Sequence, residues 1–300
     1  MKATTQSLTT AATTERSWFA VCADLFKARL TLLVLLTTLV GFYLASPSPV
    51  NYVLMINTIL GTALVVCGAA ALNQLWERQF DAKMRRTQNR PLPAGRLQPP
   101  TVLLVGCGTA LAGLIYLAVA VDLTVAILGA VSLVVYVFLY TPLKRVTWLN
   151  TAVGTVPGGL PVVMGWTAAR GSITVESLAL FGILAFWQIP HFMAIAWVYR
   201  EEYRKAGFKM LPVLDPDGTL TGRQAVLNTV ALLPVSLLPY FFGLVGPVYL
   251  VGSFLLGAGF LWSALRFSLH LDMPRAWHLF YLSIIYLPVL LILLVVDKIK

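Results

Sequence analysis

Long apolar runs separated by short polar segments fill the chain from residue 30 onward. Leu30–Trp76 contains no Asp, Glu, Lys or Arg, and its length suits two spans that break at the prolines near residue 48. A helix that crosses the hydrocarbon core needs about 20 mostly apolar residues. The later runs give two spans in 97–143, one in 146–169, one in 177–199, two in 224–265 and one in 276–296. The pattern therefore predicts an all-α polytopic membrane protein with about nine transmembrane helices.

Composition agrees with this prediction, because 58% of the 300 residues are hydrophobic and only 11% are charged. A soluble globular domain carries about a quarter charged residues. We expect a polar cytoplasmic N-terminal segment at residues 1–28 and a single transmembrane domain at residues 29–300. The first apolar run begins late for a secretory signal, so it is interpreted as an uncleaved span.

The basic residues are distributed unevenly between the two sides of the predicted bundle. If the N-terminus is cytoplasmic, all but three of the 22 Lys and Arg residues lie in inner segments, the exceptions being Arg170, Lys298 and Lys300. Positive charge is enriched in cytoplasmic loops, so the N-terminus is predicted inside and the C-terminus outside. The same excess suits anionic headgroups of the lipid bilayer and explains the net charge of +10 without a nucleic-acid partner.

Two carboxylates and an amide interrupt the apolar pattern at the inner end of the second span. Read as a helix, Asn73, Glu77 and Asp81 lie at positions i, i+4 and i+8, so their oxygens share one face. Oxygen ligands of this kind bind Mg²⁺. Arg86 and Arg90 follow closely and could hold phosphate oxygens. The stretch predicts a metal–diphosphate site at the membrane surface, although acids that merely pair with neighbouring bases would give a similar pattern.

A known family shares the motif N-x-x-x-E-R-x-F-D-A-x-M-x-R-T-x-x-R-P-L-P-x-G-R, which spans Asn73–Arg96. It resembles the first acidic motif of the UbiA-type intramembrane prenyltransferases, and more narrowly their haem-modifying branch. The stretches at 140–145, 157–161 and 190–213 also match. The resemblance thus covers about residues 73–213 in sequence, and the helical pattern fits through the C-terminus.

The resemblance implies a ring of nine helices around a central cavity, with Mg²⁺ and basic residues holding a prenyl diphosphate. In the haem branch, farnesyl diphosphate would be joined to a vinyl group of haem B with addition of water, giving haem O and diphosphate. Haem B is then a substrate and Mg²⁺ the cofactor. A downstream haem A synthase or oxidase assembly factors are the implied partners. The site would face the cytoplasm at a bacterial inner membrane rather than a mitochondrial one.

The family's chemistry can be carried over to individual residues of this chain. Asn73, Glu77 and Asp81 become the expected catalytic and Mg²⁺-binding residues, and Lys144 an expected catalytic cation. The residues expected to bind the diphosphate are Arg86, Arg90, Lys144 and Arg145.

The second acidic motif departs from the pattern of many family members. Tyr199 and Tyr203 stand where a D-x-x-x-D pattern has its two Asp residues, with Glu201 and Glu202 between them. Glu201, Glu202 and Tyr203 are therefore candidates for a second acidic site. The departure favours the haem branch, as does Glu77 in place of the Asp found in quinone-type members.

One further residue, His191, lies in an apolar run directly after Pro190. A histidine within a span is a functional candidate. It could contact haem as an iron ligand, act as a general acid or base, or simply hydrogen-bond within the helix packing.

Three other functions remain to be separated from haem farnesylation. Another UbiA-type enzyme would prenylate an aromatic or quinone-precursor acceptor. A transporter would carry charged residues near mid-membrane, where this sequence places few. A non-catalytic haem-handling assembly protein would yield no prenylated product.

Overall fold

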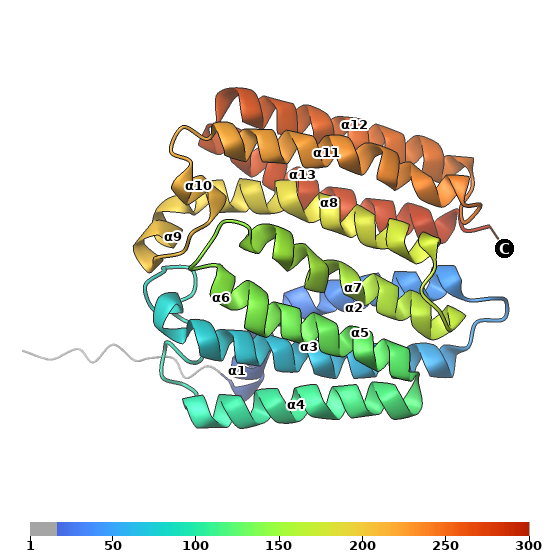
Figure 1. Cartoon of the computed structure of the whole chain (residues 1–300), viewed down its shortest axis with the longest axis horizontal. Coiled ribbons are helices and arrows are strands. Elements are labelled where there is room, and N and C mark those ends of the chain that lie inside the picture. The colour runs from blue at the N-terminus through green and yellow to red at the C-terminus, as the bar shows by residue number, and fades with distance from the viewer. Residues whose placement is uncertain (1–16, 300) are drawn as a thin grey trace, which may run out of the picture.

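The fold is a bundle of long helices, shown by a computed structural model that describes residues 17–299 (Figure 1). The first 16 residues of the predicted polar segment lie outside the described residues, and the predicted division at residue 28 stays a prediction. The helices in chain order are α1 (Trp18–Leu25), α2 (Ala28–Ala45), α3 (Tyr52–Asp81), α4 (Pro99–Ala120), α5 (Leu123–Val134), the π-helical η1 (Val135–Tyr140), α6 (Thr141–Leu143), α7 (Asn150–Arg170), α8 (Val175–Val198), α9 (Arg200–Ala206), α10 (Leu211–Leu214), α11 (Thr219–Phe241), α12 (Pro247–His270) and α13 (Met273–Val296).

The predicted spans correspond to helices with shifts of a few residues at their ends. Within residues 17–299, eight helical stretches are long and apolar enough to cross a membrane, α5, η1 and α6 forming one of them. The remaining predicted span is α7, whose prolines, glycines and threonines make it less apolar than the others. The all-α membrane fold is confirmed, while the count of nine and the orientation of the termini stay predictions.

Small residues let several helices approach closely. A Cβ added to Gly113 of α4 would lie 2.7 Å from the backbone nitrogen of Val65 on α3. A Cβ added to Gly165 of α7 would clash with the carbonyl oxygen of Thr38 on α2. Such small residues are typical of helix contacts in membranes, where van der Waals packing replaces the hydrophobic effect. These residues hold α2 against α7 and α3 against α4, and so fix two walls of the interior.

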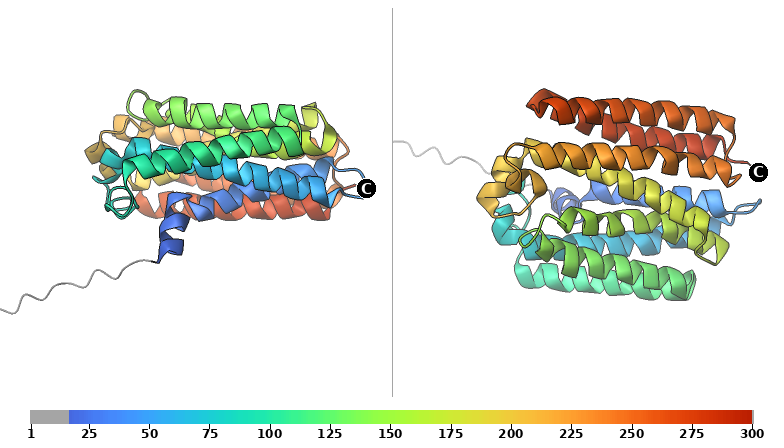
Figure 2. Two further views of the ribbon diagram at one scale, coloured as in Figure 1. Left: turned by 90° about the horizontal axis from the view of Figure 1, so that it is seen from below. Right: turned by 45° about the horizontal axis from the view of Figure 1, so that its top comes forward.

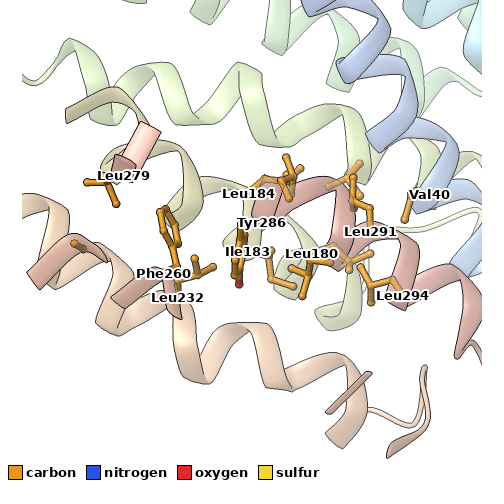
Figure 3. Close-up of a cluster of buried hydrophobic side chains, with 14 of the residues drawn as sticks. Val40, Leu180, Ile183, Leu184, Leu232, Phe260, Leu279, Tyr286, Leu291 and Leu294 are labelled. Atoms are coloured by element: carbon orange, nitrogen blue, oxygen red, sulfur yellow. The ribbon is translucent and has the colours of Figure 1, made fainter. Parts of the chain in front are cut away.

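The largest buried apolar cluster lies where α8, α11, α12 and α13 meet (Figure 3). Ile183, Leu232, Phe260 and Tyr286 are 2% exposed or less. Large apolar side chains also cover the outside of the bundle, for example Leu104, which is 76% exposed. An apolar exterior of this kind is the surface that lipid chains would contact.

The two ends of the bundle differ. The connection after α3, the short α6, and α9 and α10 gather at one end, and short turns join the helices at the opposite end (Figure 1). Figure 2 shows α1 standing off the bundle rather than running within it. The chain turns sharply between α1 and α2 at Lys27, whose φ of 49° lies in the left-handed region. The end with the long connections is the one that carries the predicted acidic motifs.

Candidate active site

A cavity of about 580 Å³ lies among α2, α3, η1, α7, α8 and α13. Its size falls within the range of roughly 300–1,000 Å³ that ligand sites occupy. Most of its wall is apolar and aromatic, including Val34, Leu133, Phe192 and Phe280. Charged side chains line it where α3 ends: Lys27, Glu77, Asp81, Arg86, Arg90 and Lys144. The cavity can therefore hold a ligand with an apolar body and an anionic group.

The two acids of the first motif sit in the last two turns of α3, as the helical spacing predicts. Lys144 Nζ donates to Glu77 Oε1 at 2.8 Å. Arg90 donates to Asp81 Oδ2 at 2.7 Å. Both carboxylates are buried, at 6% and 1% exposure. The other oxygen of Asp81, Oδ1, is buried without a hydrogen-bond partner among the described residues. Such an atom is costly unless a ligand or cation completes it.

Asn73 is fully buried and is not among the residues that line the cavity. Its Nδ2 donates to Thr141 Oγ1 at 2.9 Å, and its Oδ1 accepts from Lys27 Nζ at 2.6 Å. The amide thus ties α3 to α6 and to the start of α2. This placement makes Asn73 a residue that positions Lys27, and its predicted metal ligation stays a prediction.

Lys27 is a site residue that the sequence reasoning did not single out. Its Nζ also donates to the Tyr136 hydroxyl at 3.2 Å, and the side chain lines the cavity. Burial, followed by the nearby charge of Arg90, lowers the pKa of Lys27 to about 7. The signal in the sequence was its position three residues before the first long apolar run, which places a cation at the inner end of a span.

A π-helical segment shapes the wall beside these cations. In η1 the rings of Tyr136 and Tyr140 stack with centroids 5.7 Å apart. Lys144 Nζ lies 4.4 Å from the centroid of Tyr140, a cation–π contact. Burial alone would lower the pKa of Lys144, but the Glu77 carboxylate raises it above its ordinary value. π-Helical turns are frequent at functional sites, and no periodicity in the sequence indicates this one.

The second motif reaches the cavity through its tyrosines. Arg86 donates to the Tyr203 hydroxyl at 2.9 Å, and its guanidinium lies over the rings of Tyr199 and Tyr203, 5.1 and 5.7 Å from their centroids. Glu202 accepts from the backbone nitrogen of Arg86 at 3.4 Å, while Glu201 pairs with exposed Arg204. Neither glutamate lines the cavity. The two predicted motifs therefore meet at Arg86, with tyrosines in the contact.

Two further predicted residues have different positions relative to the cavity. Arg145 packs its guanidinium on the ring of Phe80, 4.7 Å from the centroid, and is not among the cavity-lining residues. Its predicted contact with phosphate stays a prediction. His191 does line the cavity, and its Nδ1 lies 2.7 Å from Ser283 Oγ.

Within residues 17–299, no group of three or more His, Cys, Asp or Glu side chains is arranged to hold a metal ion. The carboxylates of Glu77 and Asp81 are the acids at the cavity, and four cations stand around them. A site with two carboxylates and surplus positive charge suits a polyanionic ligand, which can supply oxygen ligands of its own.

The fold and the cavity together define an integral membrane protein with an internal site for an amphipathic anion. The profile of the UbiA prenyltransferase family matches residues 34–286. The chain belongs to this family. It is 45% identical over 284 residues to a protoheme IX farnesyltransferase of Solibacter usitatus, covering 92% of this chain and 97% of that one. It is 42% identical to the protein of the same name from Salinibacter ruber, covering 91% and 96%.

Solved structures share the fold at low sequence identity. A digeranylgeranylglyceryl phosphate synthase aligns with a TM-score of 0.79 at 14% identity, covering 93% of this chain and 98% of that one. A UbiA homolog from Archaeoglobus fulgidus bound to GPP and Mg²⁺ aligns with a TM-score of 0.65 at 15% identity, covering 92% and 99%. These likenesses support the fold of the bundle.

Proposed function

We propose that this protein transfers the farnesyl group of farnesyl diphosphate to a vinyl group of haem B, with addition of water, to give haem O and diphosphate. The observation that carries the proposal is the gathering of Glu77 and Asp81 with four cations at one end of a mostly apolar and aromatic cavity. The names of the relatives at 45% and 42% identity supply the acceptor. The product would serve the biogenesis of haem-copper oxidases.

Mg²⁺ is the proposed cofactor, and the residues present fit it. Asp81 Oδ1 is a buried oxygen that lacks a partner among the described residues, and Glu77 lies one helical turn away on the same face. Mg²⁺ is commonly held by one or two carboxylates together with substrate phosphates. Glu77 and Asp81 would hold the ion. Asn73 would assist by tying α3, the helix that carries both acids, to Thr141 of α6. When bound, Mg²⁺ supplies neutralising charge for the departing diphosphate.

The cations of the cavity would bind and orient the diphosphate. Lys27, Arg86, Arg90 and Lys144 stand within reach of one ligand, because all of them line the same cavity. Arg90 is paired with Asp81, and Lys144 with Glu77. The diphosphate would therefore replace these carboxylates as the partner of the two cations, rather than enter a cluster of unpaired charges. Arg86 is held by two tyrosines instead of an acid, which leaves its charge for the ligand.

The reaction breaks the bond between farnesyl C1 and the diphosphate oxygen, and the electron pair leaves with the diphosphate. C1 then bonds to the terminal vinyl carbon of haem B. Water adds its hydroxyl to the neighbouring carbon and releases one proton. The apolar wall would keep water from the allylic carbon until the new bond has formed, while Tyr136 and Tyr140 present ring faces that favour positive charge.

The remaining contacts and the setting complete the proposal. His191 would contact the haem from the aromatic part of the cavity, and Glu201, Glu202 and Tyr203 would organise the connection that carries Arg86. The protein would lie in a bacterial inner membrane with its active site at the cytoplasmic face. A haem A synthase or an oxidase assembly factor would take up the product.

The decisive experiment supplies purified protein in detergent with farnesyl diphosphate, Mg²⁺ and haem B, and measures haem O by mass spectrometry. A parallel reaction replaces haem B by an aromatic quinone precursor. We expect haem O in the first reaction and no prenylated product in the second. Prenylation of the aromatic acceptor alone would overturn the choice of haem, and absence of product with both acceptors would overturn the enzymatic function.

A further inference from the structure

We infer that Ser283 is a positioning residue that fixes His191 in the tautomer whose Nε2 is unprotonated, so that His191 can ligate the iron of the incoming haem from the cavity wall. The inference rests on the proposed function, because it concerns recognition of the haem acceptor. It adds that the protein recognises the acceptor through the iron of the porphyrin. Ser283, which lies on α13 whereas His191 lies on α8, makes this recognition possible.

The hydrogen-bond directions around Ser283 set the tautomer. Ser283 has a single hydroxyl proton, and its Oγ donates this proton to the carbonyl oxygen of Phe280 at 2.5 Å. Toward His191 Nδ1, which lies 2.7 Å away, the same oxygen is then the acceptor. In a neutral imidazole one nitrogen carries the proton and the other has the lone pair. With the proton on Nδ1, the lone pair of His191 is on Nε2.

The position of Ser283 is itself held by α8. Its side chain is completely buried, and its carbonyl oxygen accepts from Trp187 Nε1 at 2.9 Å. Trp187 and His191 lie one turn apart on α8, so both polar atoms of Ser283 that face α8 are occupied by aromatic side chains of that helix. A buried hydroxyl with two defined partners has little freedom to reorient, which makes it a reliable acceptor for Nδ1.

The ring of His191 is oriented by aromatic neighbours. It stacks on Trp187, with centroids 5.2 Å apart and planes 24° apart, and it lies 5.0 Å from Phe280 at 31°. Phe192 makes a third, edge-on ring contact at 5.7 Å. These contacts and the bond at Nδ1 fix the ring, and Nε2 is the ring nitrogen left for the cavity that His191 lines. Within residues 17–299, Nε2 has no hydrogen-bond partner, and it is not a sealed buried atom. An edge presented in this way suits a metal ion.

Histidines that ligate metals usually donate from their other ring nitrogen to a fixed acceptor, which sets the orientation and basicity of the ligand. Neutral imidazole is also a standard axial ligand of haem iron. His191 lies seven residues before the end of α8, about 10 Å along the bundle from its end. Iron held there would leave the charged end of the cavity, where α3 ends, to the diphosphate.

The other histidines of the chain do not compete for this role. His270 and His278 are exposed and do not line the cavity, and His270 Nδ1 already contacts the carbonyl oxygen of Arg266. The thioethers of Met84 and Met210 do line it, and they are the alternative ligands that the experiment has to distinguish.

The experiment binds ferric and ferrous haem B, or iron-free protoporphyrin IX, to the purified full-length protein. Absorption, electron paramagnetic resonance and resonance Raman spectra report the axial ligand of the iron. We expect histidine ligation in the wild type and its loss in His191→Gln. Added imidazole should restore the histidine-type spectrum in His191→Gly. The matched control His270→Gln should leave the spectrum unchanged.

The role of Ser283 is tested separately with Ser283→Ala and Ser283→Thr. Alanine removes the acceptor for Nδ1, so haem affinity should fall about tenfold or more and the iron–histidine signature should shift. Threonine keeps the hydroxyl and should restore both. Binding of radiolabelled farnesyl diphosphate should remain at the wild-type level in all these variants. This result would exclude unfolding as the cause of the changes in haem binding.

Selectivity for the metal is the second readout. The wild type should bind haem at least about tenfold more tightly than protoporphyrin IX, and His191→Gln should bind the two porphyrins about equally. An unshifted histidine signature with unchanged haem affinity in Ser283→Ala would overturn the role of Ser283. A wild-type spectrum that His191→Gln does not alter would overturn the inference as a whole and direct attention to Met84 or Met210. Haem O formation by the wild type under those outcomes would leave the proposed function standing.

Discussion

At the scale of single residues, the site consists of buried charges that are paired before any ligand arrives. Glu77 has Lys144 and Asp81 has Arg90 as partners, at 2.8 and 2.7 Å. Removing one member of a buried pair leaves the other charge uncompensated, which is more damaging than the pair itself is stabilising. Substitutions here should therefore conserve shape and be judged by catalysis and folding together.

The first prediction concerns Asp81. Asp81→Asn keeps the size of the side chain but removes its charge. If the amide oxygen keeps the bond with Arg90, the NH2 group, a donor that cannot ligate a metal, stands in place of the free oxygen Oδ1. Turnover should therefore fall roughly 100-fold or more. The rate of haem O formation and its dependence on Mg²⁺ concentration measure the effect. Asp122→Asn is the matched control, because Asp122 caps α5 through Thr124 N at the opposite end of the bundle and Asn caps helices equally well. Equal rates in the two variants would contradict the role of Asp81.

The second prediction concerns Lys27. Lys27→Met removes the donor to Asn73 Oδ1 and to the Tyr136 hydroxyl while keeping an unbranched side chain. The buried Asn73 Oδ1 and the part-buried Tyr136 hydroxyl then lose this donor and the diphosphate loses a cation, so the KM for farnesyl diphosphate should rise about tenfold. Arg29→Met changes an exposed neighbour and serves as the control. If KM responds to neither substitution, Lys27 acts only in the fold.

At the scale of elements, the sequence predicted the long helices well, because each of them spans about the length that a bilayer requires, with α5, η1 and α6 counted as one stretch. The i, i+4, i+8 spacing correctly placed Asn73, Glu77 and Asp81 on one helix, and α3 does extend to Asp81. The π-helical η1 could not be predicted, because a change in hydrogen-bond register leaves no mark on hydropathy. Lys27 was missed for a related reason: its inward direction depends on a left-handed turn between α1 and α2.

The functional pairing inside the site was also beyond the sequence. Acids and bases could be assigned to one end of the bundle, but the pair Glu77–Lys144 depends on how α3 and α6 approach, and the pair Asp81–Arg90 on how the connection after α3 folds back. The same is true of Arg86, which was expected to bind phosphate and whose guanidinium lies over the rings of Tyr199 and Tyr203. Side-chain partners across helices follow from packing, which is decided by small residues at the helix contacts.

The third prediction tests those contacts within one helix. Gly113 and Gly108 both belong to α4, but a Cβ at Gly113 would lie 2.7 Å from Val65 N, whereas a Cβ at Gly108 would meet no atom within 4 Å. Gly113→Ala should lower the free energy of unfolding by about 1–3 kcal/mol. Gly108→Ala should leave it unchanged or raise it by up to about 1 kcal/mol. Thermal unfolding in detergent, followed by circular dichroism, compares them, and equal melting temperatures would refute the close α3–α4 contact.

At the scale of the whole molecule, the two ends of the bundle are built for different purposes. The C-terminus lies at the end of the bundle opposite α9 and α10 (Figure 1). There Lys298 Nζ donates to the carbonyl oxygens of Tyr43 and Ser46 at 2.7 and 2.8 Å and so ties the end of α13 to the end of α2. Asp297 accepts from Tyr249 N at 2.6 Å and caps α12. This end is closed by bonds between helix termini. The other end leaves room for charged side chains and long connections.

The fourth prediction concerns the orientation of this asymmetric bundle in the membrane. Because the basic excess lies at the end with the long connections, that end should face the cytoplasm. Arg96→Cys and Arg170→Cys replace exposed residues at opposite ends of the bundle. Each is made in a background without native thiols, obtained with Cys22→Ser, Cys67→Ser and Cys107→Ser.

An impermeant maleimide applied to intact spheroplasts should label Arg170→Cys directly, and Arg96→Cys only after the membrane is permeabilised. The reverse pattern would place the carboxylates and cations of the cavity on the outer side. Farnesyl diphosphate and haem B would then have to be supplied there, which would refute a cytoplasmic active site without changing the chemistry of the cavity. Orientation and catalysis are separable in this protein because the charge asymmetry that inserts the bundle involves many basic residues, whereas the site uses only those that turn inward.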